Sequence, residues 1–91
     1  MRELLVDTCE TEISAGQVGQ YSYYILVDEM EVAEGFSCES YGVKVADLAR
    51  GEAESVPNIT VSVSRIDELI DLLIRNLVTP VTLRDVVEDW L

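Results

Sequence analysis

Five acidic residues on either side of a short glycine-containing segment are the side chains that could do chemistry together: Asp28, Glu29, Glu31, Glu34 and Glu39. If they flank a hairpin, two carboxylates could meet across it and act as an acid and a base. Solvated charge on a turn is the simpler explanation. Their spacing does not match a calcium-binding loop, which needs a glycine between regularly spaced acids and a closing glutamate. We therefore treat these five residues as a candidate interaction surface.

Other catalytic residue types are scarce. The chain has no histidine, a single lysine (Lys44) and two cysteines, Cys9 and Cys38. A serine or cysteine nucleophile needs a neighbouring base, and a zinc site needs several thiolates or imidazoles. The segment Gly16–Gly19 lacks the lysine and the strand-to-helix context of a phosphate-binding loop. The sequence thus assigns no catalytic residue, no metal ligand and no cofactor. We expect the cysteines to be small hydrophobic residues facing a core; a redox pair is the alternative.

The four tyrosines, Tyr21, Tyr23, Tyr24 and Tyr41, could form a stacking platform for a ligand. Tyrosines also pack well across pleated strands, and we favour that structural explanation. The ligand hypothesis remains as a rival function. It describes a small-molecule-binding protein or minor enzyme with a pocket of Tyr and carboxylate side chains between a sheet and helices.

The charge is strongly negative and unevenly distributed. Eighteen acidic residues against six basic ones give a net charge of −12, and residues 1–56 alone carry −9. Such a surface repels phosphate backbones, which excludes DNA or RNA binding through a basic patch. The leading hypothesis is a non-catalytic interaction or regulatory module whose acidic half binds a basic protein. Self-association through an edge strand or a helix face is a related option, and mimicry of a nucleic acid is a third.

The first two thirds of the chain read as strands, at residues 3–13, 20–32, 36–49 and 53–63, joined by turns at 15–19, 33–35 and 50–52. Links this short favour an antiparallel meander. The second strand is apolar on both faces near its middle, which is typical of a central strand. Pro57 cannot donate a ladder hydrogen bond, so it predicts an edge strand or a bulge.

From Ser64 the apolar period changes from two to 3.6. A stripe from Ile66 to Val78 predicts a helix capped by Ser64, with a surface pair between Asp71 and Arg75. Thr79-Pro80 ends that helix, and a second stripe from Leu83 to Leu91 follows, capped by Thr79 or by Thr82 with Asp85. Trp90 and Leu91 at the very end indicate a docked C-terminus.

These elements predict one domain over residues 1–91, an α+β fold in which a four-stranded antiparallel meander (1–63) is covered on one face by a helical pair (64–91). The seven apolar side chains of the first stripe contribute on the order of 10–20 kcal/mol when fully buried, which requires the stripe to lie against the sheet.

The N-terminus lacks the apolar stretch of a signal peptide, and no segment has the roughly 18 apolar residues of a membrane span. We therefore expect a cytoplasmic protein with reduced thiols and no membrane partner. Three parts of the sequence carry a family resemblance: residues 38–43, Val78-Thr79-Pro80, and Leu83 followed by residues 85–91. On these residues the chain resembles a small family of proteins of unknown function from anaerobic Gram-positive bacteria. The resemblance implies a bacterial cytosolic setting and no activity, cofactor or catalytic residue.

Overall fold

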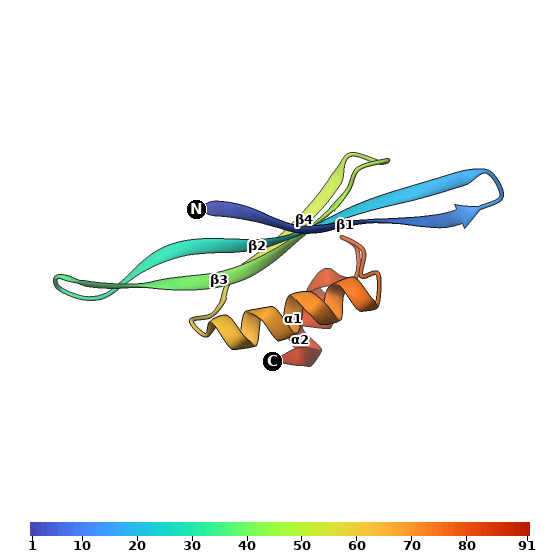
Figure 1. Cartoon of the computed structure of the whole chain (residues 1–91). Helices are drawn as coiled ribbons and strands as arrows, with labels where there is room; N and C mark the ends of the chain where they lie inside the picture. The colour runs from blue at the N-terminus through green and yellow to red at the C-terminus, as the bar shows by residue number, and fades with distance from the viewer.

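The computed structural model describes residues 1–91, apart from the side chain of Ile13. The sequence pattern places Ile13 on the same side of the first strand as Leu5 and Cys9, and for Ile13 this expectation lies outside what the structure describes. The elements follow in the order β1 (Arg2–Ser14), β2 (Gln17–Ala33), β3 (Phe36–Asp47), β4 (Glu52–Thr60), α1 (Val63–Arg75) and α2 (Leu83–Trp90). The strands form one open antiparallel sheet in the order β1-β2-β3-β4, and both helices follow it (Figure 1). The predicted α+β fold is confirmed.

The sheet is much longer than the helices that cover it. β2 has 17 residues, and the molecule measures 56 × 23 × 18 Å. Figure 1 shows the β1–β2 hairpin and the β2–β3 hairpin extending in opposite directions from the centre, where the helices lie. We call residues 10–20 the β1–β2 arm and residues 28–40 the β2–β3 arm. The core is therefore confined to the middle of the sheet.

Both arms end in two-residue turns that use a glycine at positive φ, Gly16 at 81° and Gly35 at 79°. This conformation is accessible to glycine at little cost. The predicted loop at residues 15–19 is too long. Gly19 lies inside β2 and pairs with Thr11, so only Ala15 and Gly16 form the turn.

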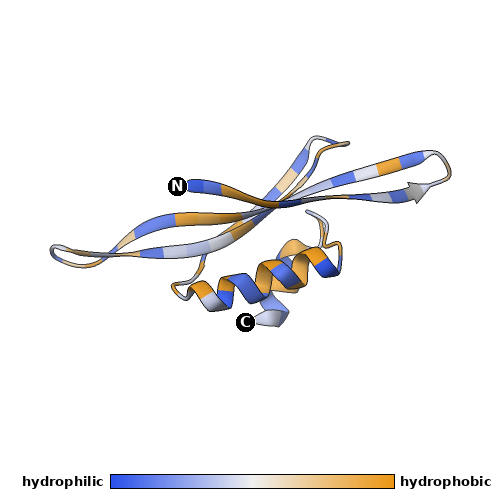
Figure 2. Cartoon of the chain, viewed as in Figure 1, coloured by the Kyte–Doolittle hydropathy of each residue, from blue (hydrophilic) through white to orange (hydrophobic). Residues whose placement is uncertain are grey.

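The core forms between alternate residues of the central strands and one face of each helix. Tyr23 pairs with Val45 across β2 and β3, and both side chains are fully buried. Figure 2 shows hydrophobic and hydrophilic bands alternating along the helices, as expected of amphipathic segments. The helical side chains buried in the core are Ile66, Leu69, Ile70, Leu73, Leu83 and Val87. This packing confirms the prediction that the helical pair covers one face of the sheet.

The predicted effect of Pro57 is confirmed, because β4 is both an edge strand and irregular at this point. Tyr41 pairs with Thr60 and Val43 with Val56, so three residues of β4 lie opposite Gly42. A Cβ atom at Gly42 would meet the Val56 carbonyl oxygen at 2.4 Å and Pro57 Cα at 2.6 Å. Only glycine lets the bulged strand approach this closely.

The helix boundaries differ from the predicted ones. Ser62, and not Ser64, caps α1 by accepting a hydrogen bond from the Arg65 backbone N–H at 3.3 Å. The helix ends at Arg75, and Leu77 follows with a φ of 48°. Val78, the last residue of the predicted apolar stripe, lies in the loop after α1. Its side chain is buried in the core although it is not part of the helix. The predicted pair of Asp71 with Arg75 is confirmed at 3.0 Å.

Thr82 is the N-cap of α2, but its side chain makes no capping hydrogen bond. Its hydroxyl lies 3.2 Å from the Thr79 hydroxyl, so the predicted capping pair with Asp85 is wrong. The prediction of a docked C-terminus is correct for Trp90, which packs against the core. The Arg65 guanidinium carbon lies over the Trp90 ring, 4.1 Å from its centroid. The prediction is wrong for Leu91, whose exposure is 71%.

Within the described residues, neither helix is long and apolar enough to cross a membrane.

Candidate functional site

The β2–β3 arm brings all five predicted acidic residues to one end of the molecule. Asp28, Glu29 and Glu31 lie on β2, Glu34 is in the turn and Glu39 is on β3. The register places Glu29 directly opposite Glu39. The five acidic residues, which are close in sequence, therefore also lie close together in space along the β2–β3 arm.

The five carboxylates do not all share a face. Side chains alternate along a strand, so Glu29, Glu31 and Glu39 point to the helix side of the sheet and Asp28 points to the other side. The Asp28 carboxylate accepts a hydrogen bond from the Glu29 backbone N–H at 3.0 Å. This local contact orients Asp28 without bringing it to the other acids.

Two like charges directly opposite each other destabilise a strand pair, and neighbouring residues offset this effect for Glu29 and Glu39. The Ser37 hydroxyl donates to Glu29 at 2.7 Å, and the Arg2 guanidinium pairs with Glu39 at 2.9 Å. The Arg2 and Glu39 side chains are 69% and 52% exposed, so the ion pair contributes little to stability. Sequence reasoning missed Arg2 because its position across β2 from Glu39 depends on the register of three strands.

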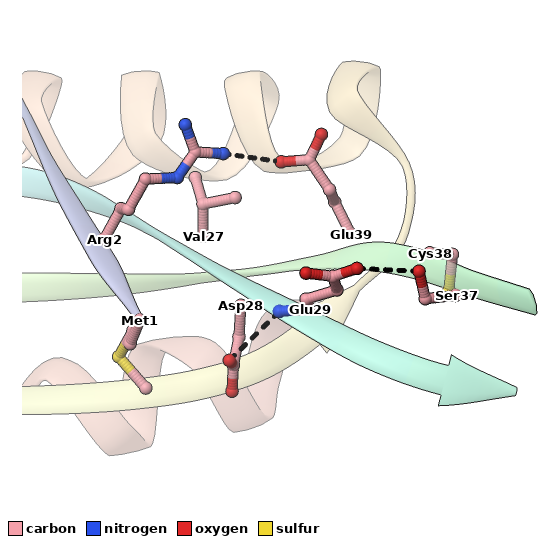
Figure 3. Close-up of a pocket in the computed structure, with 8 residues that line it drawn as sticks. All are labelled: Met1, Arg2, Val27, Asp28, Glu29, Ser37, Cys38 and Glu39. Carbon is pink, nitrogen blue, oxygen red and sulfur yellow. Dashed lines mark hydrogen bonds and ion pairs between the residues drawn. The ribbon is translucent and has the colours of Figure 1, made fainter.

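An open hollow of about 490 Å³ lies beside these residues (Figure 3). In Figure 3 the Arg2 side chain reaches past Val27 toward Glu39, while Met1 and Asp28 lie on the other side of the β2 ribbon. A cationic group would meet carboxylate oxygens here. The residues that line the hollow are Met1, Arg2, Val27, Asp28, Glu29, Ser37, Cys38 and Glu39.

The tip of the same arm exposes large apolar side chains, which sequence reasoning did not single out. Phe36 is 71% exposed, Val32 64% and Met30 40%. A second open hollow of about 400 Å³ is lined by Phe36 together with Glu29, Glu31, Gly35 and Ser37. An aromatic ring beside carboxylates attracts cations through both its π face and the adjacent charges. The signal in the sequence was Phe36 directly after a turn, next to acids.

The cysteines are free, and the geometry contradicts the redox-pair alternative. Cys9 lies opposite Tyr21 and Cys38 opposite Met30, nine residues further along β2. Nine residues of strand span about 30 Å, far beyond disulfide reach. Partial burial, with a smaller contribution from the Asp7 carboxylate, raises the pKa of the Cys9 thiol. A raised pKa lowers the thiolate population and with it the reactivity of Cys9.

The tyrosines do not form one platform. Tyr21 and Tyr23 are buried in the core, and Tyr41 packs against it. Tyr24 points to the opposite face, where the Lys44 ammonium lies 5.2 Å from its ring centroid. Burial, followed by the smaller effects of Cys9 and Tyr21, raises the pKa of Tyr23 to about 12. Tyr23 is therefore a neutral structural residue at ordinary pH.

Among the described residues, no three Cys, Asp or Glu side chains gather as metal ligands would. The fold and the site together define a small α+β protein with an acidic, apolar-tipped hairpin arm.

A family model described as "Family of unknown function (DUF6514)" matches residues 2–91, and the chain belongs to this family. No curated protein and no solved structure matches the chain.

Proposed function

We propose that this protein is a non-catalytic interaction module that binds a basic protein partner through the β2–β3 arm. The observation that supports the proposal is the combination of the carboxylates of Glu29, Glu31 and Glu39 with the exposed ring of Phe36 on an arm that extends from the core. The carboxylates speed up the encounter with a positively charged partner, whereas the exposed aromatic ring contributes binding energy once the partner is in contact.

The physical basis is complementary charge followed by local contact. A net charge of −12 accelerates the encounter with a cationic surface at low salt. Lys or Arg side chains of the partner would then reach the carboxylates beside Phe36, whose ring adds a cation–π contact. The proposed setting is the cytoplasm, which the free thiols of Cys9 and Cys38 support.

The test compares matched variants of the two arms. The first replaces Glu29 and Glu31 by Gln and Phe36 by Ala; the second replaces Glu10 and Glu12 by Gln and Val18 by Ala. Each variant loses two charges and one exposed apolar side chain, since Val18 is 57% exposed. The probe is a fluorescent amphipathic peptide rich in Lys and Arg, and binding is followed by anisotropy over a salt series.

The variant of the β2–β3 arm is expected to bind at least about tenfold more weakly, corresponding to about 1.4 kcal/mol, while the control changes less than about twofold. Binding of the wild-type chain should weaken as salt rises. Equal losses in both variants would show that only net charge matters and would refute a site on the β2–β3 arm.

The rival function is a small-molecule binder with a Tyr and carboxylate pocket between sheet and helices. It has less support, because Tyr21 and Tyr23 fill the core at the proposed position of the pocket. A metabolite panel that raises the melting temperature of the wild type, but not of Phe36→Ala, would instead favour a ligand in the hollow at the tip of the arm.

A further inference from the structure

The two edges of the sheet are protected to different degrees. β4 has 9 residues, contains Pro57 and a bulge, and lies against α2, where Arg84 contacts the Glu54 carboxylate and the Ser55 carbonyl oxygen, each at 3.3 Å. β1 has 13 residues and pairs only with β2 within the described residues. Its outer edge therefore presents backbone N–H and C=O groups that another strand can pair with.

The N-terminal part of β1 has apolar side chains on both faces of this open edge. Leu4 and Leu5 are neighbours in an extended strand and point to opposite faces, and they are 48% and 59% exposed. Val6 follows at 45% exposure, at the point where the pairing with β2 shifts. A strand paired to this edge would place a cross-strand neighbour beside each of these side chains and remove part of their apolar surface from water.

We propose that two copies of this chain associate reversibly by antiparallel pairing of their β1 edges, with Leu4 of one copy opposite Leu4 of the other. A two-fold axis perpendicular to the sheet keeps the helices of both copies on the same side. The paired segment covers residues 2–6, because the irregularity between Leu5 and Asp7 interrupts the ladder beyond it. The result is a continuous sheet through both copies.

The charges along β1 select this arrangement. Arg2 and Glu3 lie before the apolar segment, and Asp7, Glu10 and Glu12 lie after it. Lys44 of the same copy already pairs with Glu3 at 2.7 Å. Antiparallel pairing about Leu4 brings Arg2 of each copy next to Val6 and Asp7 of the other. The two Glu10 residues are then separated by twelve residues of strand, about 40 Å, well beyond the screening length of about 8 Å at physiological salt. Parallel pairing would instead align like charges along the whole strand.

A disulfide trap tests the register directly. In a Cys9→Ser, Cys38→Ser background, Leu4→Cys would place two thiols on directly opposed residues, whose Cα atoms lie about 4.5–5.5 Å apart. The control is Val18→Cys on β2, where the native side chain is 57% exposed, against 48% for Leu4. Under mild oxidation we expect the covalent dimer to form at least about tenfold faster for Leu4→Cys than for Val18→Cys. Equal rates would overturn the proposal.

Sedimentation velocity provides a second readout on the unmodified chain. We expect a concentration-dependent dimer that Leu4→Lys abolishes, because two ammonium groups would then face each other, while Val18→Lys retains it. A pairing of five residues is short compared with stable interfaces, so association should appear only at high concentration. A strict monomer at millimolar concentration would refute the dimer. Peptide binding by the β2–β3 arm is measured separately, so either proposal can fail alone.

Discussion

Replacing Tyr23 by Phe removes one hydroxyl group from the centre of the core. The Tyr23 side chain is fully buried, and its hydroxyl donates to the Val78 carbonyl oxygen at 3.0 Å, in the loop between α1 and α2. The substitution keeps the ring but leaves that carbonyl without its donor. A hydrogen bond of this kind contributes about 1 kcal/mol to the free energy of unfolding, so the variant should be less stable by that amount at neutral pH.

Alkaline pH should reverse the order of the two stabilities. The pKa of Tyr23 is raised from 10.0 to about 12, chiefly by burial. The folded state therefore holds the phenolic proton more tightly than the unfolded chain does. This stabilisation is fully present below pH 10 and is lost as the pH rises through about 12. The loss amounts to about 3 kcal/mol, and Tyr23→Phe does not suffer it. The two stability curves should cross near about pH 11.

The assay is urea unfolding of both proteins at constant ionic strength, from about pH 7 to about pH 12, followed by circular dichroism and by Trp90 fluorescence. The difference between the two proteins at each pH cancels the titration of every group they share. If this difference stays constant across the alkaline range, Tyr23 is not shielded as the structure describes, and the reasoning fails.

Further substitutions test the other local features by the same unfolding measurement. Gly42→Ala should cost at least about 2 kcal/mol, because its Cβ would lie 2.4 Å from the Val56 carbonyl oxygen; Gly16→Ala, in open space at positive φ, should cost only about 1 kcal/mol. Ser62→Ala should cost about 1 kcal/mol as a lost N-cap, whereas Ser64→Ala should be neutral or slightly stabilising; the reverse result would restore the predicted boundary. Trp90→Ala should cost about 1–3 kcal/mol through lost packing, and deletion of Leu91 less than about 0.5 kcal/mol.

Local patterns in the sequence were sufficient to predict the fold. The 3.6-residue stripe from Ile66 onward identified α1, and the alternation in the strands identified the meander, because both patterns record burial directly. The ends of the elements were harder to place. Ser62 and Ser64 are the same residue type and equally suitable as N-caps, but only Ser62 caps α1. Glycine is common in turns, yet Gly19 pairs with Thr11 inside β2. Only tertiary packing decides between such alternatives.

The candidate site was predicted in part for a related reason. The acids were visible because they are close in sequence. The ion pair of Arg2 with Glu39 joins residues 37 positions apart and depends on how β1, β2 and β3 align. The two-residue turns set that register, and the apolar residues at the tip gain meaning only when the arm is seen to extend from the core.

Because β2 is longer than the core it crosses, the length of the two arms is independent of the core packing that stabilises the molecule. Its middle residues belong to the core, while its two ends belong to different arms. Because side chains alternate with a period of two, inserting or removing residues in matched pairs on both strands of an arm preserves which face each side chain occupies. Each such step moves a tip by about 6.6 Å. The distance between the tips of the two arms can therefore change in such steps while the packing of the core stays the same.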